Sequence, residues 1–449
     1  MATPRTVAFH TLGCKLNYSE TSALARLFES SGYLPVKFEE EADIYVLNTC
    51  SVTEQADREC RKIVRQVMRR QPGAFMVVTG CYAQLKPQEI ADIPGVDLVL
   101  GAGEKFRIID YVDELSKAQG KGMVRAGDVR DVNTFSSSFS FGDRTRSFLK
   151  VQDGCDYKCT FCTIPQARGA SRSDTVESAV ANARKIAEMG TREIVLTGVN
   201  IGDFGNGTEV IEGARPRKEA LFADLVKELD QVETVSRFRI SSIEPNLLTD
   251  EIIEFVANSQ RFMPHFHIPL QSGNNKQLAE MRRRYRRELY AERVTSIKRL
   301  MPHACIGCDV IVGFPGETEA DFLESYEFVQ NLDISYLHVF TYSERANTPA
   351  AEMAGKVPIE ERRRRNQAFR GLSEMKRRAF YQEHLGTTRP VLFEQHRDPA
   401  LLTGFTDNYV KIEVPLALGK VNDIGPVALQ SLSLDGESVL SKGVSWFQG

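Results

Sequence analysis

The hydrophobic positions of the first 125 residues form short apolar runs separated by longer amphipathic segments. The apolar runs lie at 6–13, 44–50, 75–81 and 96–101, and the clearest helical periodicity lies at 19–32 and 54–73. Short apolar strands that alternate with helices are typical of parallel βαβ units. Residues 1–125 are therefore predicted to form an open parallel α/β domain, with Ser19 and Thr53 as helix N-caps.

The same alternation resumes after a polar, serine-rich stretch at 126–146, which is predicted to be a linker. Six further apolar runs follow at a regular pace, with helical segments between them, at 147–152, 193–199, 237–243, 265–271, 308–314 and 336–342. Six βα units in series predict a partial (βα)6 barrel over 147–383, whose last element is an arginine-rich helix. In such a barrel the active-site groups lie at the C-terminal ends of the strands.

The last segment, 384–449, has a different pattern. Short strand-like runs are separated by Gly, Asp and Asn, which predicts a small all-β module. The fold class is therefore α/β with a terminal β domain. Three domains also agree with a chain of 449 residues, at roughly 150 residues per domain.

Composition narrows the class of protein further. With 42% apolar and 26% charged residues the chain is an ordinary globular protein. It has neither an apolar run long enough to span a bilayer nor a secretory signal region at its N-terminus. We expect a cytoplasmic protein with no membrane association. The net charge of −3 does not indicate a nucleic-acid binder, although arginines cluster at 282–287, 362–365 and 376–378.

Nine cysteines, an odd number, favour metal binding or catalysis over disulfides in a cytoplasmic chain. Three of them, Cys155, Cys159 and Cys162, have the spacing C-x3-C-x2-C directly after the first predicted barrel strand. A loop this short directs three thiolates at one inorganic cluster and leaves a fourth iron without a protein ligand. A structural zinc site with a distant fourth ligand is the alternative.

A second triad is spread along the N-terminal domain. Cys14, Cys50 and Cys81 each end an apolar run. Because the carboxyl ends of parallel strands meet at one edge of a sheet, these thiols are predicted to form a second metal site. The alternative is three small buried hydrophobes.

The remaining cysteines indicate packing. Cys60 lies in the middle of a predicted helix. Cys305 and Cys308 enter the fifth barrel strand, where residues three apart point to opposite faces and cannot easily share a metal or a disulfide.

With Phe161 before its last cysteine, the C-x3-C-x2-C motif resembles that of the radical S-adenosylmethionine (SAM) superfamily. Together with TLGCKLN, HFHIPLQSG and GFPGETEADF, the chain as a whole resembles the radical-SAM methylthiotransferases. The nearest branch modifies tRNA that carries N6-threonylcarbamoyladenosine at position 37. Gln166 departs from that branch, which usually has an aromatic residue there.

The resemblance implies an N-terminal methylthiotransferase domain, a radical-SAM barrel and a C-terminal TRAM domain. It also implies two [4Fe-4S] clusters, one on each cysteine triad, with all six cysteines catalytic and SAM chelating the open iron of the barrel cluster. One SAM would methylate a sulfur on the N-terminal cluster. A second would supply the radical that removes hydrogen from C2 of adenine 37, and the product would be the 2-methylthio nucleoside. The expected partners are tRNA, through its anticodon stem-loop, and a reducing electron donor, and the enzyme is expected to be a monomer.

Other substrates and another class of protein stay open. The same chemistry could act on isopentenyladenosine 37 of tRNA or on an aspartate of a ribosomal protein, although TLGCKLN favours the threonylcarbamoyl branch. The alternative from another class of protein is a non-enzymatic RNA-binding module whose clusters are purely structural.

Residues at the predicted strand ends are the candidates for contact with SAM, because a barrel site is built there. With Phe161 they are Thr197, Gly198, Asn200, Glu244, Gln271 and Gly313. Arg168 and Arg172 follow the triad closely and are predicted to bind the carboxylate of the threonylcarbamoyl group, which an arginine can hold through two hydrogen bonds.

Overall fold

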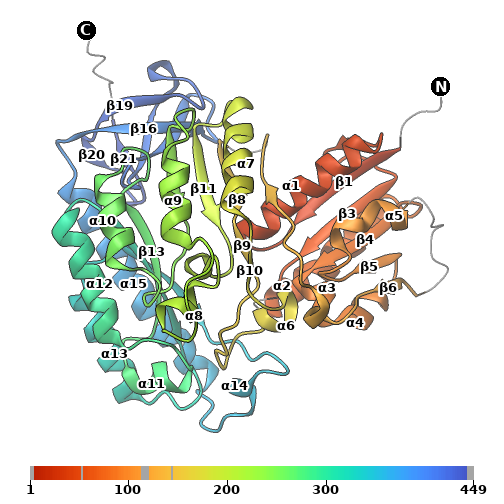
Figure 1. Ribbon diagram of the computed structural model, residues 1–449, viewed down its shortest axis with the longest axis horizontal. Helices are drawn as coiled ribbons and strands as arrows, with labels where there is room; N and C mark the ends of the chain where they lie inside the picture. The colour runs from red at the N-terminus through yellow and green to blue at the C-terminus, as the bar shows by residue number, and fades with distance from the viewer. Residues whose placement is uncertain (1–4, 52–53, 113–120, 143–144, 442–449) are drawn as a thin grey trace.

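The computed structural model describes residues 5–51, 54–112, 121–142 and 145–441 (Figure 1). Its N-terminal unit is a parallel sheet of six strands in the order β2-β1-β3-β4-β5-β6. The strands are β1 (Thr6–Thr11), β2 (Leu34–Val36), β3 (Ile44–Thr49), β4 (Phe75–Gly80), β5 (Leu98–Leu100) and β6 (Met123–Arg125). The predicted open α/β domain is confirmed.

Helices cover both faces of this sheet. They are α1 (Lys15–Ser30), α2 (Glu54–Arg70), α3 (Cys81–Leu85), α4 (Pro87–Ala91) and α5 (Ile108–Val112). One apolar cluster holds α1 and α5 against the sheet, and a second holds α2 and α4 against the opposite face. Because both faces are covered, β3 and β4 are buried along their whole length, which explains their uninterrupted apolar runs.

The first helix begins earlier than predicted. It starts at Lys15 with Cys14 in the N-cap position, so Ser19 lies inside the helix and donates to the carbonyl of Leu16. The prediction of Ser19 as the cap was therefore wrong, since the chain turns into the helix directly at the cysteine. Thr53 lies outside the described residues.

The central unit is a partial barrel of six parallel strands (Figure 1). They are β8 (Arg146–Lys150), β11 (Glu193–Thr197), β12 (Arg237–Ile240), β13 (His265–Gln271), β14 (Cys305–Val312) and β15 (Tyr336–Thr341). The covering helices are α7 (Val176–Glu188), α9 (Phe222–Asp230), α10 (Asp250–Asn258), α12 (Arg287–Leu300), α13 (Glu319–Asn331) and α15 (Ile359–Glu383). The six predicted βα units are present. Among the described residues no ladder joins β12 to β13, and the two halves of the barrel meet there through one isolated bridge, from Phe238 of β12 to Phe262, which precedes β13.

Shorter elements lie at the ends of these strands. They are β9 (Gln152–Asp153), β10 (Arg172–Ser173), α6 (Ile164–Arg168), α8 (Gly207–Ile211), α11 (Asn275–Glu280) and α14 (Pro349–Glu352). The stretch predicted as a linker contains β7 (Ser138–Phe139), which pairs antiparallel with β8. This stretch is thus partly built into the barrel sheet beside α1.

A six-stranded β domain follows α15, in the order β19-β16-β17-β18-β21-β20. Its strands are β16 (Thr388–Gln395), β17 (Leu401–Thr406), β18 (Lys411–Pro415), β19 (Ile424–Ala428), β20 (Ser431–Leu432) and β21 (Val439–Leu440). It packs against the N-terminal ends of the barrel strands, opposite the end where the cysteine loop lies.

Buried arginines attach this β domain to the barrel. Arg239 donates to Glu193 at 2.8 Å and to the carbonyls of Thr406 and Asp407, both at 2.8 Å. Arg237 donates to the carbonyl of Pro390 at 2.8 Å. These side chains are nearly inaccessible to water, so each hydrogen bond replaces one that water would otherwise make.

Replacing Arg239 by alanine should lower the free energy of unfolding by about 3–5 kcal/mol, because Glu193 stays buried with one partner fewer. Denaturant titration monitored by circular dichroism measures the change. Lys227→Ala, which removes an exposed ion pair with Glu251, is the control and should cost less than about 1 kcal/mol. Equal effects of the two substitutions would contradict the proposed anchoring role of Arg239.

Candidate functional site

Three thiols converge on the loop between β9 and α6, at the C-terminal end of the first barrel strand. The backbone N–H of Tyr157 donates to Sγ of Cys155, and that of Ile164 donates to Sγ of Cys162, each at 3.4 Å. Gly154 enters the loop with φ of +70°, where a Cβ would lie 1.9 Å from the carbonyl oxygen of Ala170. The loop therefore requires glycine directly before its first cysteine.

Burial raises the pKa of all three thiols, that of Cys162 to about 11. The negative charge of another cysteine or of Glu244 raises each pKa further. Three neighbouring thiols, of which Cys159 is buried and the other two are half-buried, cannot all ionise readily unless a cation neutralises them, as a metal cluster does. The chemistry and crowding of this set fit a bound cluster.

A buried ion pair stands beside this triad. Arg283 donates to Sγ of Cys159 at 3.0 Å and forms an ion pair with Glu244, which follows β12. Glu244 was a predicted cofactor contact, whereas Arg283 was noted only as part of the basic run at 282–287. No local feature of the sequence distinguishes this inward-facing arginine from its neighbours.

Unpaired polar atoms line the neighbouring strand ends. Asn200 follows β11, and both the nitrogen and the oxygen of its buried amide have no hydrogen-bond partner among the described residues. The Oε1 atom of Gln152 accepts from the backbone N–H groups of Val199 and Asn200, at 3.0 and 2.8 Å, and so fixes the turn. A buried amide without partners is the group that a polar ligand would satisfy. Thr197 is the last residue of β11, and Gly198 begins the turn.

Two further predicted contacts lie at the ends of β13 and β14. Gln271 has a φ of +71°, an unusual conformation for a residue with a side chain. Gly313 has a φ of +73°, and a Cβ there would lie 2.4 Å from Cγ of Arg362, so protein atoms occupy the space on that side. Phe161 is half-buried against the barrel core.

The second triad lies at the C-terminal edge of the N-terminal sheet. Cys14 follows β1 as the N-cap of α1, Cys50 follows β3, and Cys81 follows β4 as the first residue of α3. Adjacent parallel strands thus deliver all three. A Cβ on Gly13 would lie 2.5 Å from Cβ of Cys50, which shows how closely the first two cysteine segments approach.

Positive charge surrounds this second triad. Burial raises the pKa of the Cys81 thiol, while Arg168 and Lys105 oppose that rise. A small cavity of about 40 Å³ is lined by Cys81 together with four basic side chains but only two carboxylates: Lys105, Lys150, Arg168, Arg172, Glu20 and Asp153. The surplus of positive charge suits thiolates and the anionic cluster they would hold.

The same charged side chains join the two domains. We call the buried set Glu20, Lys105, Lys150, Asp153 and Arg168 the interdomain network. Glu20 of α1 accepts from Lys105 at 2.6 Å, from Lys150 at 3.1 Å and from Arg168 at 3.1 Å. Asp153 accepts from Lys150 at 3.1 Å and from Arg168 at 2.9 Å.

This network contacts the backbone of both the N-terminal domain and the barrel. Arg168 donates to Oδ1 of Asn17 at 2.6 Å, and the Asn17 amide donates to the carbonyls of Leu12 and Thr49, close before Cys14 and Cys50. Asp153 accepts from the N–H of Gly154, directly before Cys155. One set of ion pairs therefore positions cysteines of both triads.

The predicted role of Arg168 and Arg172 in substrate binding finds no support in this geometry. Arg168 is 4% exposed, and its guanidinium donates hydrogen bonds to Glu20, Asp153 and Asn17. Arg172 is bound to Asp153 and to backbone carbonyls, including that of Thr134. Sequence proximity to the triad reflected a structural role.

A second bridge between the domains went unnoticed in the sequence. Arg345, on the loop after β15, donates to Oγ of Ser51 at 2.6 Å and to Asp57 at 3.0 Å. Ser51 directly follows Cys50, so this loop of the barrel braces the second triad from another side.

The other three cysteines are packing residues, as predicted. Burial raises the pKa of each, Cys60, Cys305 and Cys308, to about 12. Cys305 packs in the core of the terminal β domain and Cys308 in that of the barrel, so the pair do point to opposite faces of β14.

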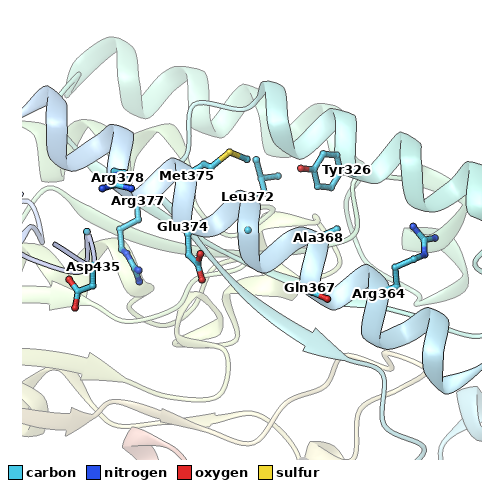
Figure 2. A pocket seen from close by; sticks show the side chains of 12 residues that line it. Tyr326, Arg364, Gln367, Ala368, Leu372, Glu374, Met375, Arg377, Arg378 and Asp435 are labelled. Carbon is cyan, nitrogen blue, oxygen red and sulfur yellow. The ribbon is translucent and has the colours of Figure 1, made fainter. Parts of the chain in front are cut away.

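A groove of about 630 Å³ runs along α15 beside the terminal β domain. Figure 2 shows Arg364, Arg377 and Arg378 along it, with Met375 and Tyr326 nearby. Of the predicted basic runs, Arg362 and Arg365 are buried, whereas these three arginines remain at the groove. Within the described part of the chain, Arg378 forms no ion pair, so it is available to an anion.

The helices of the described residues include none with the length and apolarity needed to cross a membrane.

Glu20→Gln should lower the free energy of unfolding at pH 7 by about 3–5 kcal/mol, because buried Lys105, Lys150 and Arg168 would lose their shared carboxylate. Burial alone would raise the pKa of Glu20, but Arg168, Lys105 and Lys150 hold it well below its usual range.

This shift sets a pH dependence. The contribution of Glu20 is complete above the unfolded-state pKa of about 4.3 and is lost as pH falls through the lower folded-state pKa. The difference in stability between wild type and Glu20→Gln should therefore shrink below about pH 4 in denaturant titrations. A difference that does not change between pH 7 and pH 3 would contradict the assigned ion pairs.

Comparison with known proteins gives this site a family. Residues 6–101 match the family described as uncharacterized protein family UPF0004, and residues 149–329 match the radical SAM superfamily. A solved structure of the radical SAM methyltransferase TsrM from Kitasatospora setae, with cobalamin and a [4Fe-4S] cluster bound, covers 78% of this chain and 77% of its own at a TM-score of 0.54. At 15% identity this similarity concerns the fold alone.

Closer relatives cover almost the whole chain. The threonylcarbamoyladenosine tRNA methylthiotransferase MtaB of Bacillus subtilis is 40% identical over 91% of this chain and 90% of its own, and that of Aquifex aeolicus is 39% identical over 91% and 96%. A tRNA-2-methylthio-N(6)-dimethylallyladenosine synthase of Desulfitobacterium hafniense is 31% identical over 97% and 96%. One cysteine triad lies in the UPF0004 domain and one in the radical SAM barrel, and the chain belongs to the radical-SAM tRNA methylthiotransferase family.

Proposed function

We propose that this protein converts N6-threonylcarbamoyladenosine 37 of tRNA to its 2-methylthio derivative. The observation that carries the proposal is the pair of three-cysteine sites, one in the N-terminal domain and one in the barrel. A common set of ion pairs positions both. Four relatives that are 32–40% identical over at least 91% of the chain are named for this substrate.

The residues fit two [4Fe-4S] clusters and SAM. Cys155, Cys159 and Cys162 would hold one cluster and Cys14, Cys50 and Cys81 the other, and three ligands leave one iron of each cluster open. When bound, these groups supply reductive cleavage of SAM at the barrel and a sulfur for transfer at the N-terminal site.

The chain's own residues position and enclose this chemistry. The partner-free amide of Asn200 lies at the strand end beyond β11, where it supports a contact with SAM. Arg283 holds both Glu244 and the sulfur of Cys159 and so fixes the wall beside the first triad. Short helices α3 and α6, which begin at Cys81 and just after Cys162, pack against each other, so the two sites open toward the same space.

The groove along α15 supports a contact with the tRNA backbone. Three arginines line it, and the terminal β domain, which we assign as a TRAM domain, forms one end. Arginine is suited to phosphate, and small β barrels are common oligonucleotide platforms. Cytoplasmic location, monomeric state and an external reductant complete the proposal.

Cysteine substitutions should separate the two sites. Cys155→Ala should abolish formation of 5′-deoxyadenosine, because its cluster binds SAM. Cys50→Ala should retain it but stop methylthio transfer. Iron content should fall from about eight to about four per chain in each variant. Cys60→Ala is the matched control, since it removes a buried cysteine outside both triads. Full transfer by Cys50→Ala would refute the assignment of the second site.

Arg378→Ala should weaken binding of whole tRNA and reduce the slope of log K against log salt by about 0.9 if it contacts one phosphate. Arg370→Ala is the control, since Arg370 is exposed on the same helix but outside the groove. Binding measured by filter retention at several salt concentrations would decide. Equal slopes for wild type and Arg378→Ala would exclude this groove as a backbone contact.

Mass spectrometry of tRNA nucleosides tests the substrate directly. Cells lacking the gene should lose 2-methylthio-N6-threonylcarbamoyladenosine and accumulate its precursor. Loss of the methylthio form of isopentenyladenosine instead would identify the alternative substrate. Unchanged nucleosides would leave a ribosomal protein or a non-enzymatic role.

A further inference from the structure

A second cavity, of about 250 Å³, lies where α1 meets the interior of the barrel. Cys14 and Lys15 line it from the N-terminal domain, Arg146, Arg239 and Ser241 from barrel strands or their ends, and Tyr409 from the terminal β domain. We call it the Lys15 cavity. All three domains contribute to it, and one wall is a cysteine of the second triad.

Lys15 is the available cation in this cavity. Arg146 is bound to Glu394 at 2.9 Å, and Arg239 to Glu193 at 2.8 Å. The Lys15 ammonium has neither a hydrogen bond nor an ion pair with any residue that the structure describes.

The Asp309 carboxylate on β14 attracts the Lys15 ammonium electrostatically, without an ion pair or hydrogen bond between them. It is already engaged by His267 at 2.9 Å and lies 3.4 Å from His338. Around the cavity, Arg146, Arg237 and Arg239 share Glu193, and Glu394 binds Arg146 alone. The walls therefore carry more positive than negative charge, and an unpaired ammonium in such a place favours an anionic ligand.

We propose that the Lys15 cavity receives the threonylcarbamoyl group of the substrate nucleoside, with the Lys15 ammonium pairing with its carboxylate. This inference rests on the proposed function. In adenine, only N1 separates C2 from the carbon that bears N6, so the N6 substituent lies alongside the reacting edge. A pocket for it must border the site that delivers sulfur, as this cavity does through Cys14.

The size of the cavity agrees with this occupant. At about 250 Å³ it falls below the pockets of drug-sized ligands, which begin at about 300 Å³, and suits a substituent the size of one amino acid. An isopentenyl group carries no charge and would leave Lys15 unpaired, so the same residue would discriminate between the two nucleosides.

The test compares two anticodon stem-loops, one with the free threonyl carboxylate and one with the carboxamide, which has nearly the same shape but no charge. The anaerobically loaded holoenzyme is used, with affinity measured by fluorescence anisotropy and methylthio product by mass spectrometry. Wild type should favour the carboxylate by about tenfold to a hundredfold, the effect of one charge-assisted hydrogen bond. Lys15→Gln should abolish that preference, and Lys15→Arg should keep most of it.

Lys37→Gln, which removes an exposed lysine far from the cavity lining, is the matched control and should keep the preference. A Lys15→Gln enzyme that still prefers the carboxylate, or that loses affinity for both stem-loops equally, overturns the proposal. So does a raised KM for SAM with both stem-loops, because the anion would then be the carboxylate of SAM.

Two further outcomes are separable. If Lys15→Gln does not hold iron, Ser241→Asp provides a second test, because it places a negative charge on the barrel side of the cavity. This substitution should weaken binding of the carboxylate stem-loop more than binding of the carboxamide stem-loop. Equal weakening overturns the proposal. If wild type forms no methylthio product on the carboxylate stem-loop yet binds it in preference to the carboxamide, the proposed function fails while the cavity assignment stands.

Discussion

The contact of Arg168 with Glu20 and Asp153 is the interaction on which the rest of the arrangement depends. It joins α1, which carries Cys14 at its start, to the loop that carries the first barrel cysteine. An apolar interface could hold the two domains together with similar strength, but it would tolerate sliding. Buried hydrogen-bonded charges do not, because any displacement leaves a charge without its partner. The network thus fixes the relative position of two sites that must act on one base.

Close backbone contacts make this placement rigid. A Cβ on Gly80 would lie 2.3 Å from the carbonyl of Thr49, and one on Gly13 would clash with Cys50, so the three cysteine segments of the N-terminal domain are in direct contact. Arg345 adds a further hydrogen bond to Ser51, from the far end of the barrel sequence. Cys50 is therefore held by its own sheet and by the other domain together.

Much of this could be predicted from the sequence, because strand and helix periodicities are local and because parallel strands deliver their ends to one edge. The six barrel strands, the parallel N-terminal sheet and both triads follow from that reasoning. The interdomain network does not, since Glu20 and Arg168 lie 148 residues apart and nothing local marks them as partners. For the same reason Arg168 was predicted to face the substrate, and Arg283 could not be distinguished from the other arginines of its run. A charged residue near a site has the same appearance in sequence whether it binds the ligand or supports the protein.

That ambiguity is resolved by counting partners for each cation. Arg168 and Arg283 are saturated by carboxylates and by a thiol, so they define the walls of the site. Lys15 and Arg378 have no ion-pair partner within the described chain. Lys15 lies at a cavity beside Cys14, and Arg378 lies in an exposed groove. The net charge of the chain gives no sign of a polyanionic substrate, yet Lys15 and Arg378 lie where the proposals place the modified nucleoside and the tRNA backbone. Binding of a polyanion by a protein of net charge −3 depends on this local surplus, because exposed charges more than about 10 Å away are largely screened at physiological salt.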